Sequence, residues 1–279
     1  MVKARHAWMS LRTAVFGLAA FVFNFPLIAT AVTSLKSEAE INDNPTLTIV
    51  APTWDNYAQI RAAVERFDIL HYLGNSIAEA GLGAALALLL AFPAAYAVAR
   101  SGVGGHWLLP LVANLRAVPL IIFAIPIYLI YQGVHLLDTR IGLALILCLV
   151  NLPLVLVLLV NAIDDMPPAV EEAARMDGAG TGAMLIHVVL PLAAPAVTSA
   201  LVLSFIYGWN EYLFGLMLTT ERAVPITVGA SFFFAASGGG IHWGVAAAVM
   251  IISVLPPLAL SLFAYRYIGR ALTAGAVKG

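Results

Sequence analysis

The chain has 279 residues, of which 62% are hydrophobic and 10% are charged, with 14 Lys and Arg against 15 Asp and Glu. Soluble domains have roughly 45–50% apolar and about 25% charged residues, so this composition excludes an ordinary soluble protein. The formal net charge of -1 argues against nucleic acid as a partner, because binding to phosphates needs a surplus of basic residues. A single cysteine, Cys148, excludes a disulfide framework and a thiolate metal cluster. The sequence therefore predicts a protein that lies mostly in a lipid bilayer.

Six apolar segments, each bounded by charged or turn-forming residues, follow one another along the chain. Each has about 20–27 residues and rises about 1.5 Å per residue, which is enough to cross a hydrocarbon core of roughly 30 Å. We therefore predict an all-α, polytopic membrane protein with six transmembrane helices and a single transmembrane domain over residues 1–279. The predicted spans are 13–33, 75–99, 107–131, 141–162, 192–218 and 241–265.

The basic residues between the spans predict the orientation. With the N-terminus inside, the cytoplasmic segments hold eight Lys and Arg and the outer segments hold five. By the positive-inside rule, both termini are expected in the cytoplasm. The small residues Ala29-Thr30-Ala31 also fit a signal-peptide cleavage site, but the apolar run continues to Thr33 and is longer than a usual signal core. A retained first helix is therefore expected.

The polar segment 34–73 predicts an ordered extracytoplasmic loop. Turn-forming residues at 42–45 and 52–53 and a mixed charge favour this reading, with a short helix around 57–67. The loop serves either as a solvated connector or as a surface for a partner.

The sequence has no motif for catalysis on this chain. Its only lysines are Lys3, Lys36 and Lys278, so a phosphate-binding loop of the Walker type is impossible. The six histidines lack metal-ligand spacing, and a nucleophile elbow is missing. We therefore predict no metal, no cofactor and no enzymatic activity on this chain, and any ATP-driven work must use another polypeptide.

The cytoplasmic segment 163–191 predicts a short helix with clear ends. Asp165 is the expected N-cap, Pro168 suits the first turn, and Gly178 ends the helix. Glu171 and Arg175 are four residues apart and can pair. A second helix is expected at 181–190.

Small residues on the opposite side of this helix predict a docking face. They lie at i, i+3, i+4 and i+7 and would let the backbone approach a groove on another protein: Val170, Ala173, Ala174 and Asp177. A helix lying on lipid headgroups would need bulky apolar and basic residues instead.

The run Glu172-Ala173-Ala174, followed by Gly178 and then Val188, Leu190 and Pro191, resembles the EAA loop of bacterial ABC-importer permeases. The one departure is Val188, where isoleucine is usual. In that family, the loop is the coupling helix that sits in a cleft of the cytoplasmic ATPase. The resemblance implies these ATPase-coupling residues: Glu171, Glu172, Ala173, Ala174, Asp177 and Gly178.

The resemblance covers nearly the whole chain and is to the carbohydrate-uptake permeases of the maltose type. It is carried by Ser34-Leu35-Lys36, Asn75-Ser76, Tyr96 with Arg100, Trp209-Asn210-Glu211-Tyr212 and the tail 272–279, which is typical of the second permease of the heterodimer. The resemblance implies uptake of a sugar or sugar-like solute across the bacterial cytoplasmic (inner) membrane. The implied partners are a second homologous permease, two copies of an ABC ATPase that bind ATP and Mg, and an extracytoplasmic solute-binding protein.

Three charged residues lie inside predicted spans, where charge is costly enough to suggest function: Glu79, Arg116 and Glu211. Arg116 either pairs with Glu79 or lies on the solute path. In Trp209-Asn210-Glu211-Tyr212, aromatic faces stand beside hydrogen-bonding groups, which suits a sugar. The alternative is that Trp209 and Tyr212 belong to the interfacial aromatic belt. All six residues are predicted substrate-path candidates.

Two other functions remain open. One is ABC import of an anionic sugar derivative, such as a sulfosugar or glycerol phosphate, for which Arg116 is a hint. The other is an ion-coupled secondary carrier, which should carry inverted repeats; the sequence shows no internal repeat, so this reading is disfavoured.

Overall fold

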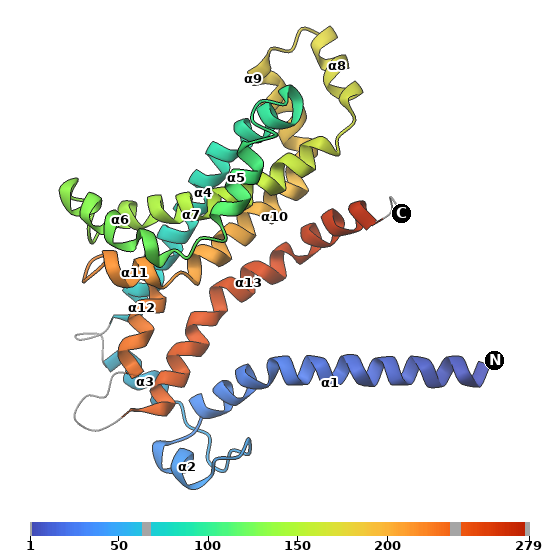
Figure 1. Cartoon of the computed structure of the whole chain (residues 1–279). Helices are drawn as coiled ribbons and strands as arrows, with labels where there is room; N and C mark the ends of the chain where they lie inside the picture. Colours follow the sequence, from blue (N-terminus) through green and yellow to red (C-terminus); the bar gives the residue numbers. More distant parts are fainter. Residues whose placement is uncertain (1, 63–67, 235–240, 277–279) are drawn as a thin grey trace. The chain divides into compact units, whose positions relative to one another are not determined.

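We describe a computed structural model of the chain, covering all residues except 1, 63–67, 235–240 and 277–279. Within these residues, all regular secondary structure is helical (Figure 1). The chain divides into two compact units, Met1–Ile69 with Ala230–Val254 and Leu70–Gly229 with Leu255–Gly279. The predicted tail motif 272–279 and the predicted loop helix 57–67 each lie partly outside the described residues.

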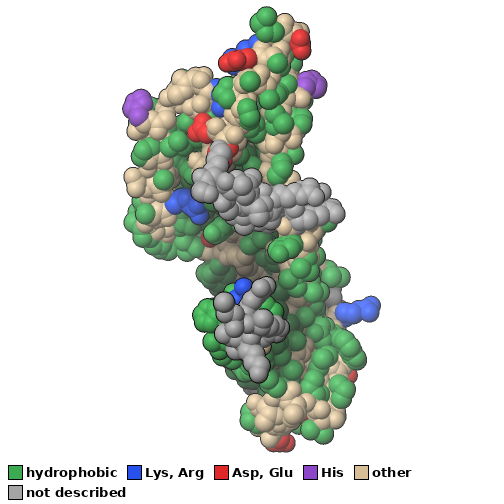
Figure 2. Space-filling view, turned by 90° about the vertical axis from the view of Figure 1, so that its right-hand side faces the viewer, with side chains coloured by type: hydrophobic (Ala, Val, Ile, Leu, Met, Phe, Trp, Pro, Cys, Tyr) green, Lys and Arg blue, Asp and Glu red, His purple; other side chains and the backbone are tan. Residues whose placement is uncertain are grey.

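Among the residues that the structure describes, five helical segments are long and apolar enough to cross a membrane. They overlap the first, second, fourth, fifth and sixth predicted spans, and the prediction of an all-α polytopic membrane protein is confirmed. Four lie within α1 (Val2–Ser34), α4 (Ile69–Ser101), α7 (Arg140–Asp164) and α13 (Trp243–Ala276), and the fifth is the continuous run Thr181–Trp209. Figure 2 shows hydrophobic side chains over much of the face it presents, as lipid-facing surfaces require.

The third predicted span, 107–131, is not one helix. It forms α5 (Leu108–Leu115) and α6 (Ile121–Gly133), separated by the segment 116–120. Pro119 lies in this break, and a proline both lacks an amide hydrogen and disfavours helical backbone in the residue before it. At 13 residues, α6 alone is too short to cross a bilayer of ordinary thickness.

The fifth predicted span, 192–218, is also divided. Its helix begins earlier than expected, with α9 (Thr181–Ala183), the π-helical turn η2 (Met184–Val189) and α10 (Leu190–Trp209) following without a break. A separate helix, α11 (Leu213–Leu218), starts after three residues. The expected second loop helix at 181–190 is therefore the beginning of the long helix rather than an element of its own.

The first unit contains an ordered segment with α2 (Glu38–Asp43) and α3 (Asp55–Ala62). The ammonium group of Lys36, a residue only 2% exposed, donates to the carbonyl oxygens of Asn44 (2.8 Å) and Thr46 (2.7 Å). The amide of Asn56 donates to the carbonyl oxygens of Ser34 and Lys36. These bonds fold the segment onto itself, which accounts for its order. The predicted loop 34–73 is shorter than expected, since α4 begins at Ile69.

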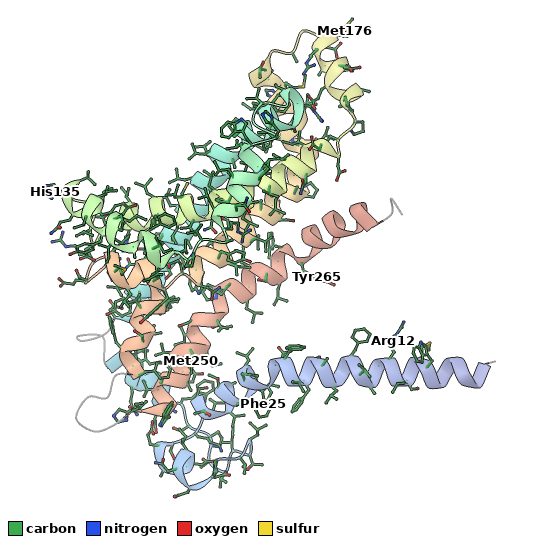
Figure 3. The ribbon with its side chains drawn as sticks, viewed as in Figure 1. Arg12, Phe25, His135, Met176, Met250 and Tyr265 are labelled. Atoms are coloured by element: carbon green, nitrogen blue, oxygen red, sulfur yellow. The ribbon has the colours of Figure 1, made fainter. Side chains whose placement is uncertain are left out.

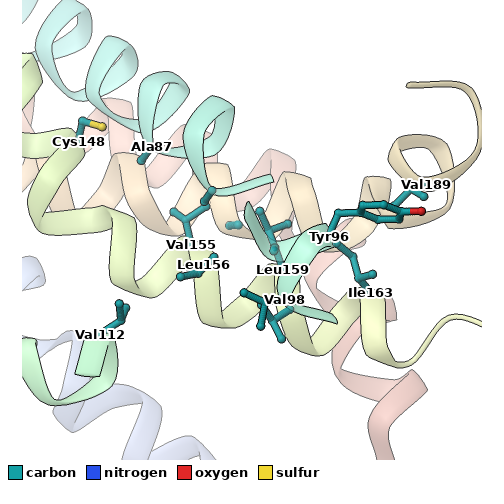
Figure 4. Close-up of a cluster of buried hydrophobic side chains, with 14 of the residues drawn as sticks. Ala87, Tyr96, Val98, Val112, Cys148, Val155, Leu156, Leu159, Ile163 and Val189 are labelled. Carbon is teal, nitrogen blue, oxygen red and sulfur yellow. The ribbon is translucent and has the colours of Figure 1, made fainter. Parts of the chain in front are cut away.

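The core of the second unit is built on a stripe of alanines along α4. They recur every three or four residues and are each at most 1% exposed: Ala80, Ala84, Ala87, Ala91 and Ala95. Side chains of α7 pack against this stripe, among them Cys148, Val155 and Leu159 (Figure 4). Such small residues let helix backbones approach closely.

Two glycines mark close contacts among the long helices α4, α7 and α10 of this unit. A Cβ atom at Gly83 would lie 2.8 Å from Cβ of Leu147 on α7. A Cβ atom at Gly208 would lie 3.4 Å from Cα of Ala80, so α10 approaches α4 closely at this position. The small residues thus fix the arrangement of α4, α7 and α10, on which the candidate site is built.

Candidate functional site

The predicted helix after the fourth span is α8 (Pro168–Met176), and its ends are set by proline and glycine. Pro168 occupies the first position and Pro167 is the N-cap, so the expected N-cap Asp165 is wrong; Asp165 instead ends α7. A residue preceding a proline favours extended backbone, which places the helix start after Pro167.

Gly178 terminates α8 with a Schellman motif. Its φ of +85° lies in the left-handed region that glycine adopts without strain. The N–H of Ala179 donates to the carbonyl of Ala174, and the N–H of Gly178 donates to the carbonyl of Arg175. These two bonds satisfy carbonyl groups at the end of the helix and reverse the chain sharply.

Glu171 anchors α8 to α4. Its residue is 4% exposed; Oε1 accepts from Nε of Arg100 at 2.7 Å, and Oε2 accepts from the hydroxyl of Tyr96 at 2.9 Å. The guanidinium of Arg100 also donates to the carbonyl of Met166. The expected pairing with Arg175 is present, at 3.8 Å. Glu171 therefore faces its own chain, whereas the sequence grouped it with residues that contact a partner.

The remaining predicted coupling residues are divided between an exposed and a packed face. Glu172, Ala173, Asp177 and Gly178 are exposed, while Ala174 packs against the buried core cluster of the second unit. The predicted stripe of Val170, Ala173, Ala174 and Asp177 is thus not a single docking face.

Sequence reasoning missed Met176 as part of the exposed face of α8. Met176 is 88% exposed and lies at the end of the helix (Figure 3). It follows Ala173 by three residues, and this helical spacing could have identified it as a neighbour on the surface. The exposed surface of α8 therefore presents Glu172, Ala173 and Met176 together, and we call these three residues the α8 face.

The four consecutive candidates 209–212 take different positions. Trp209 is 3% exposed and stacks on Phe205, with ring centroids 5.6 Å apart. Asn210 is exposed, and its side-chain amide donates to the carbonyl of Ile206. Tyr212 is 43% exposed. Both carboxylate oxygens of Glu211 accept the N–H of Phe214 at 3.0 Å, and one also accepts the N–H of Gly215, so Glu211 caps the start of α11.

Of the two alternatives left open for Arg116, the pairing with Glu79 is wrong. Glu79 is 1% exposed, and neither of its carboxylate oxygens has a hydrogen-bond partner among the described residues. Arg116 instead holds its guanidinium carbon 5.7 Å from the ring centroid of Tyr207, a cation–π contact. Position along a helix fixes depth but not the direction in which a side chain points, and the break between α5 and α6 directs Arg116 to α10.

A cavity of about 600 Å³ lies beside this break. Its lining is mostly apolar and comes from α5, α6, α7 and the α10–α11 region, with four polar side chains: Arg116, Asn151, Tyr207 and Glu211. Among the predicted candidates, Arg116 and Glu211 are thus brought together, while Asn151 and Tyr207 were missed. Both lie inside long apolar runs, where a single polar residue gives little sequence signal. The volume falls within the range of roughly 300–1,000 Å³ typical of small-molecule sites.

Polar groups tie the ends of the second unit's helices together. The side-chain amide of Asn75 donates to the carbonyls of Arg222 and Val224, and its oxygen accepts from Nε of Arg140. Asp138 accepts backbone N–H groups from four consecutive residues, 220–223. Burial alone would raise the pKa of Asp138, but these four donors outweigh it and lower the pKa to about 2.

The comparison with known families identifies the chain as part of a membrane transport family. Residues 73–274 match the family described as "Binding-protein-dependent transport system inner membrane component", and the chain belongs to this family. The chain is thus a multi-pass permease of the inner membrane with several apolar spans. The contacts that join α8 to α4 are part of this permease.

The similar proteins are permeases over nearly their whole length. The chain is 32% identical to the sulfoquinovosyl glycerol transport system permease protein SmoH of Agrobacterium fabrum, over 91% of this chain and 89% of that protein. It is 33% identical to the trehalose/maltose transport system permease protein MalG of Thermococcus litoralis, over 94% of each. The fold is similar to that of a bacterial ABC transporter for import of the acidic polysaccharide alginate, with a TM-score of 0.79, 21% identity and coverage of 95% of this chain and 98% of the other.

Proposed function

We propose that this chain forms half of the transmembrane pore of an ATP-driven ABC importer for a sugar or sugar-like solute, coupled to its ATPase through α8. Membership of the family and the names of the similar permeases support the transport class. The observation that carries the coupling role is the anchored geometry of α8. Its inner side is fixed by Glu171 to Tyr96 and Arg100, while the α8 face stays exposed.

The complex that we propose contains several other chains. A second homologous permease completes the pore, two copies of an ABC ATPase bind ATP and Mg and hydrolyse ATP, and an extracytoplasmic protein delivers the solute. Both termini of this chain lie in the cytoplasm, as the distribution of its basic residues favours. This chain supplies the path and the coupling contact, and it performs no chemistry of its own.

The anchor gives a route for coupling. When the ATPases close on ATP, they displace α8, and a helix bonded to α4 through a buried ion pair transmits that displacement to α4. The opposite end of the route is the contact of α8 with η2, which continues into α10. Because α4, α7 and α10 pack through small residues, they move as one body and change the access to the cavity lined by Arg116 and Glu211. These two residues remain our candidates for the solute path.

Two substitutions test the coupling role. Glu172→Lys reverses a charge on the α8 face, and Gly178→Asp adds a negative charge at the C-terminal end of the helix, where the helix dipole disfavours it. We expect both variants to reach the membrane with the second permease and to lose solute-stimulated ATP hydrolysis and uptake. Asp164→Lys is the matched control, since Asp164 is an exposed acid at the end of α7, outside α8.

Uptake at the wild-type rate in the Glu172→Lys and Gly178→Asp strains would remove α8 from the coupling path. A secondary carrier makes the opposite prediction for the isolated chain. Solute accumulation in liposomes that contain only this chain and an ion gradient would overturn the proposal of an ATP-driven importer.

The solute class has two candidates. One is a neutral sugar, of the kind named for the trehalose/maltose relative. The other is an anionic sugar derivative such as a sulfosugar or a glycerol phosphate, and a relative named for sulfoquinovosyl glycerol supports it.

A further inference from the structure

Arg116 is a cation without a countercharge in the part of the chain that the structure describes. It lies at the end of α5, its residue is exposed, and no ion pair or hydrogen bond joins its guanidinium group to another described residue. Its contact is the ring of Tyr207. A guanidinium between two strongly apolar helices is costly to leave unpaired. An anion from outside this chain would complete the site.

Glu211 lines the same cavity but does not neutralise Arg116. Its two carboxylate oxygens accept backbone N–H groups of Phe214 and Gly215, and neither oxygen lies within ion-pair distance of Arg116. The negative charge is thus committed to the start of α11. Among the described residues of the site, the positive charge of the Arg116 guanidinium therefore has no negative partner.

The contact with Tyr207 prepares Arg116 for such a ligand. In a cation–π contact the guanidinium lies over the face of the aromatic ring, and the attraction does not use a hydrogen bond to another polar group, so the N–H donors stay available. These donors form a planar fork that matches two oxygens of a carboxylate, sulfonate or phosphate. Asn151 lines the cavity from α7, and its amide donates to the carbonyl of Leu147, so its own oxygen can accept from a sugar hydroxyl.

We propose that this cavity holds the transported solute by an anionic group bound to Arg116, with the sugar ring beside Tyr207 and Asn151. The solute class is therefore an acidic or sulfonated sugar or a sugar phosphate, of one or two rings for a cavity of about 600 Å³. This inference rests on the proposed function, because it assumes that the cavity lies on the solute path.

The test compares two solutes that differ by one charged group. Cells that express the complete importer receive labelled glucosyl glycerol or its 6-sulfonated counterpart, and uptake is measured for wild type, Arg116→Gln and Arg116→Lys. The binding protein is the same in all strains, so its own selectivity cancels when each variant is divided by wild type. Arg222→Gln is the matched control, because it removes one exposed positive charge elsewhere in the chain. The hydrogen bonds of Arg222 to Asn75 and Asp138 use its backbone carbonyl and N–H, which the substitution keeps.

We expect Arg116→Gln to reduce uptake of the sulfonated probe at least tenfold and to leave the neutral probe, if transported, within twofold of wild type. Uptake of the sulfonated probe by Arg116→Lys should fall between that of wild type and that of Arg116→Gln, since a lysine keeps the positive charge but lacks the planar fork of N–H donors. Equal loss of both probes, or no loss, overturns the inference. A lipid phosphate or an acid of the second permease as the partner of Arg116 would produce one of those two results.

Uptake of the two probes by wild type distinguishes failure of the anion site from failure of the proposed function. If wild type shows no ATP-dependent uptake of any sugar, the proposed function fails. If wild type imports the neutral probe and the sulfonated probe neither enters nor competes, the function stands and the anion site fails. If Arg116→Gln does not co-purify with the second permease, competition between the two probes for uptake by wild type still tests the anion site.

Discussion

The Nε atom of Arg100 lies 2.7 Å from Oε1 of Glu171, and this pair joins the end of α4 to α8 across 71 positions of sequence. The side chains are 15% and 5% exposed, so the pair is mostly shielded from water. Removing one partner of such a buried pair is typically destabilising by about 3–5 kcal/mol, because the remaining charge is left uncompensated. The geometry makes Glu171 a positioning residue for α8 rather than a contact for a partner.

Glu171→Ala should therefore release α8 from α4 and leave the helix unable to hold the ATPase. We expect co-purification of the ATPase and solute uptake to fall at least tenfold while the chain still inserts. The exchange Arg100→Glu with Glu171→Arg should recover part of the activity, since it restores an ion pair. Asp164→Ala is the control for assembly of the permease itself, because Asp164 is an exposed acid at the end of α7, outside α8. Full uptake by Glu171→Ala would show that the anchor is dispensable.

Gly178 should tolerate only residues that adopt left-handed backbone. A Cβ atom at Gly178 would meet nothing within 4 Å, so the penalty comes from its φ of +85° alone, about 1–2 kcal/mol for an ordinary residue. We expect Gly178→Val to impair ATPase capture more than Gly178→Asn, as measured by pull-down from detergent. Gly182→Ala, which has the same open space without a positive φ, should be neutral. Equal effects of the Val and Asn variants would contradict a backbone origin.

Asp138 should give the protein an acid-sensitive contribution to stability. Its pKa is lowered from 3.8 to about 2, so the folded state favours the carboxylate more than the unfolded state does. The contribution is complete above about pH 4 and is lost as the pH falls through about 2. The melting temperature of purified wild type should exceed that of Asp138→Asn at pH 5, and the difference should narrow steadily down to pH 2. A difference independent of pH would disprove this assignment.

The alanine stripe on α4 should not accept larger residues. Ala87 is fully buried against α7, and overpacking a close helix contact is typically destabilising by about 1–3 kcal/mol. Ala87→Leu should lower the melting temperature in detergent and reduce assembly. Leu89→Ala, at a position that is 69% exposed, is the control and should leave both nearly unchanged. A stable Ala87→Leu variant would indicate that α4 and α7 separate more easily than their packing suggests.

The sequence predicted the long helices well where apolar runs had no internal interruption. It failed at two places where local chemistry ends a helix within an apolar run. Pro119 interrupts the third span, and the side chain of Glu211 caps a new helix after Trp209, so the fifth span divides. Hydropathy averages over such positions, whereas backbone hydrogen bonding depends on each of them.

The sequence was sufficient to predict where α8 begins and ends, but not the directions in which the side chains of the candidate site point. Pro168 and Gly178 bounded α8 because proline and glycine act through local backbone preferences. The inward direction of Glu171 depends on Tyr96 and Arg100, more than 70 positions away, and no local pattern contains that information. In the same way, Arg116 and Glu79 have compatible depths, but the azimuth of each side chain decides that they do not meet.

The π turn η2 sets the angular phase of everything that follows it on the long helix. Each residue of an α-helix advances the azimuth by about 100°, and a π turn accommodates an additional residue without lengthening the rise to match. Tyr207 reaches the cavity from α10, downstream of this turn, whereas α8 lies upstream. If the same six residues of Met184–Val189 were wound as a regular α-helix, the additional residue would rotate Tyr207 by about 100° away from Arg116. The additional residue in η2 thus sets the angle between the α8-contacting start of the long helix and its cavity-lining side.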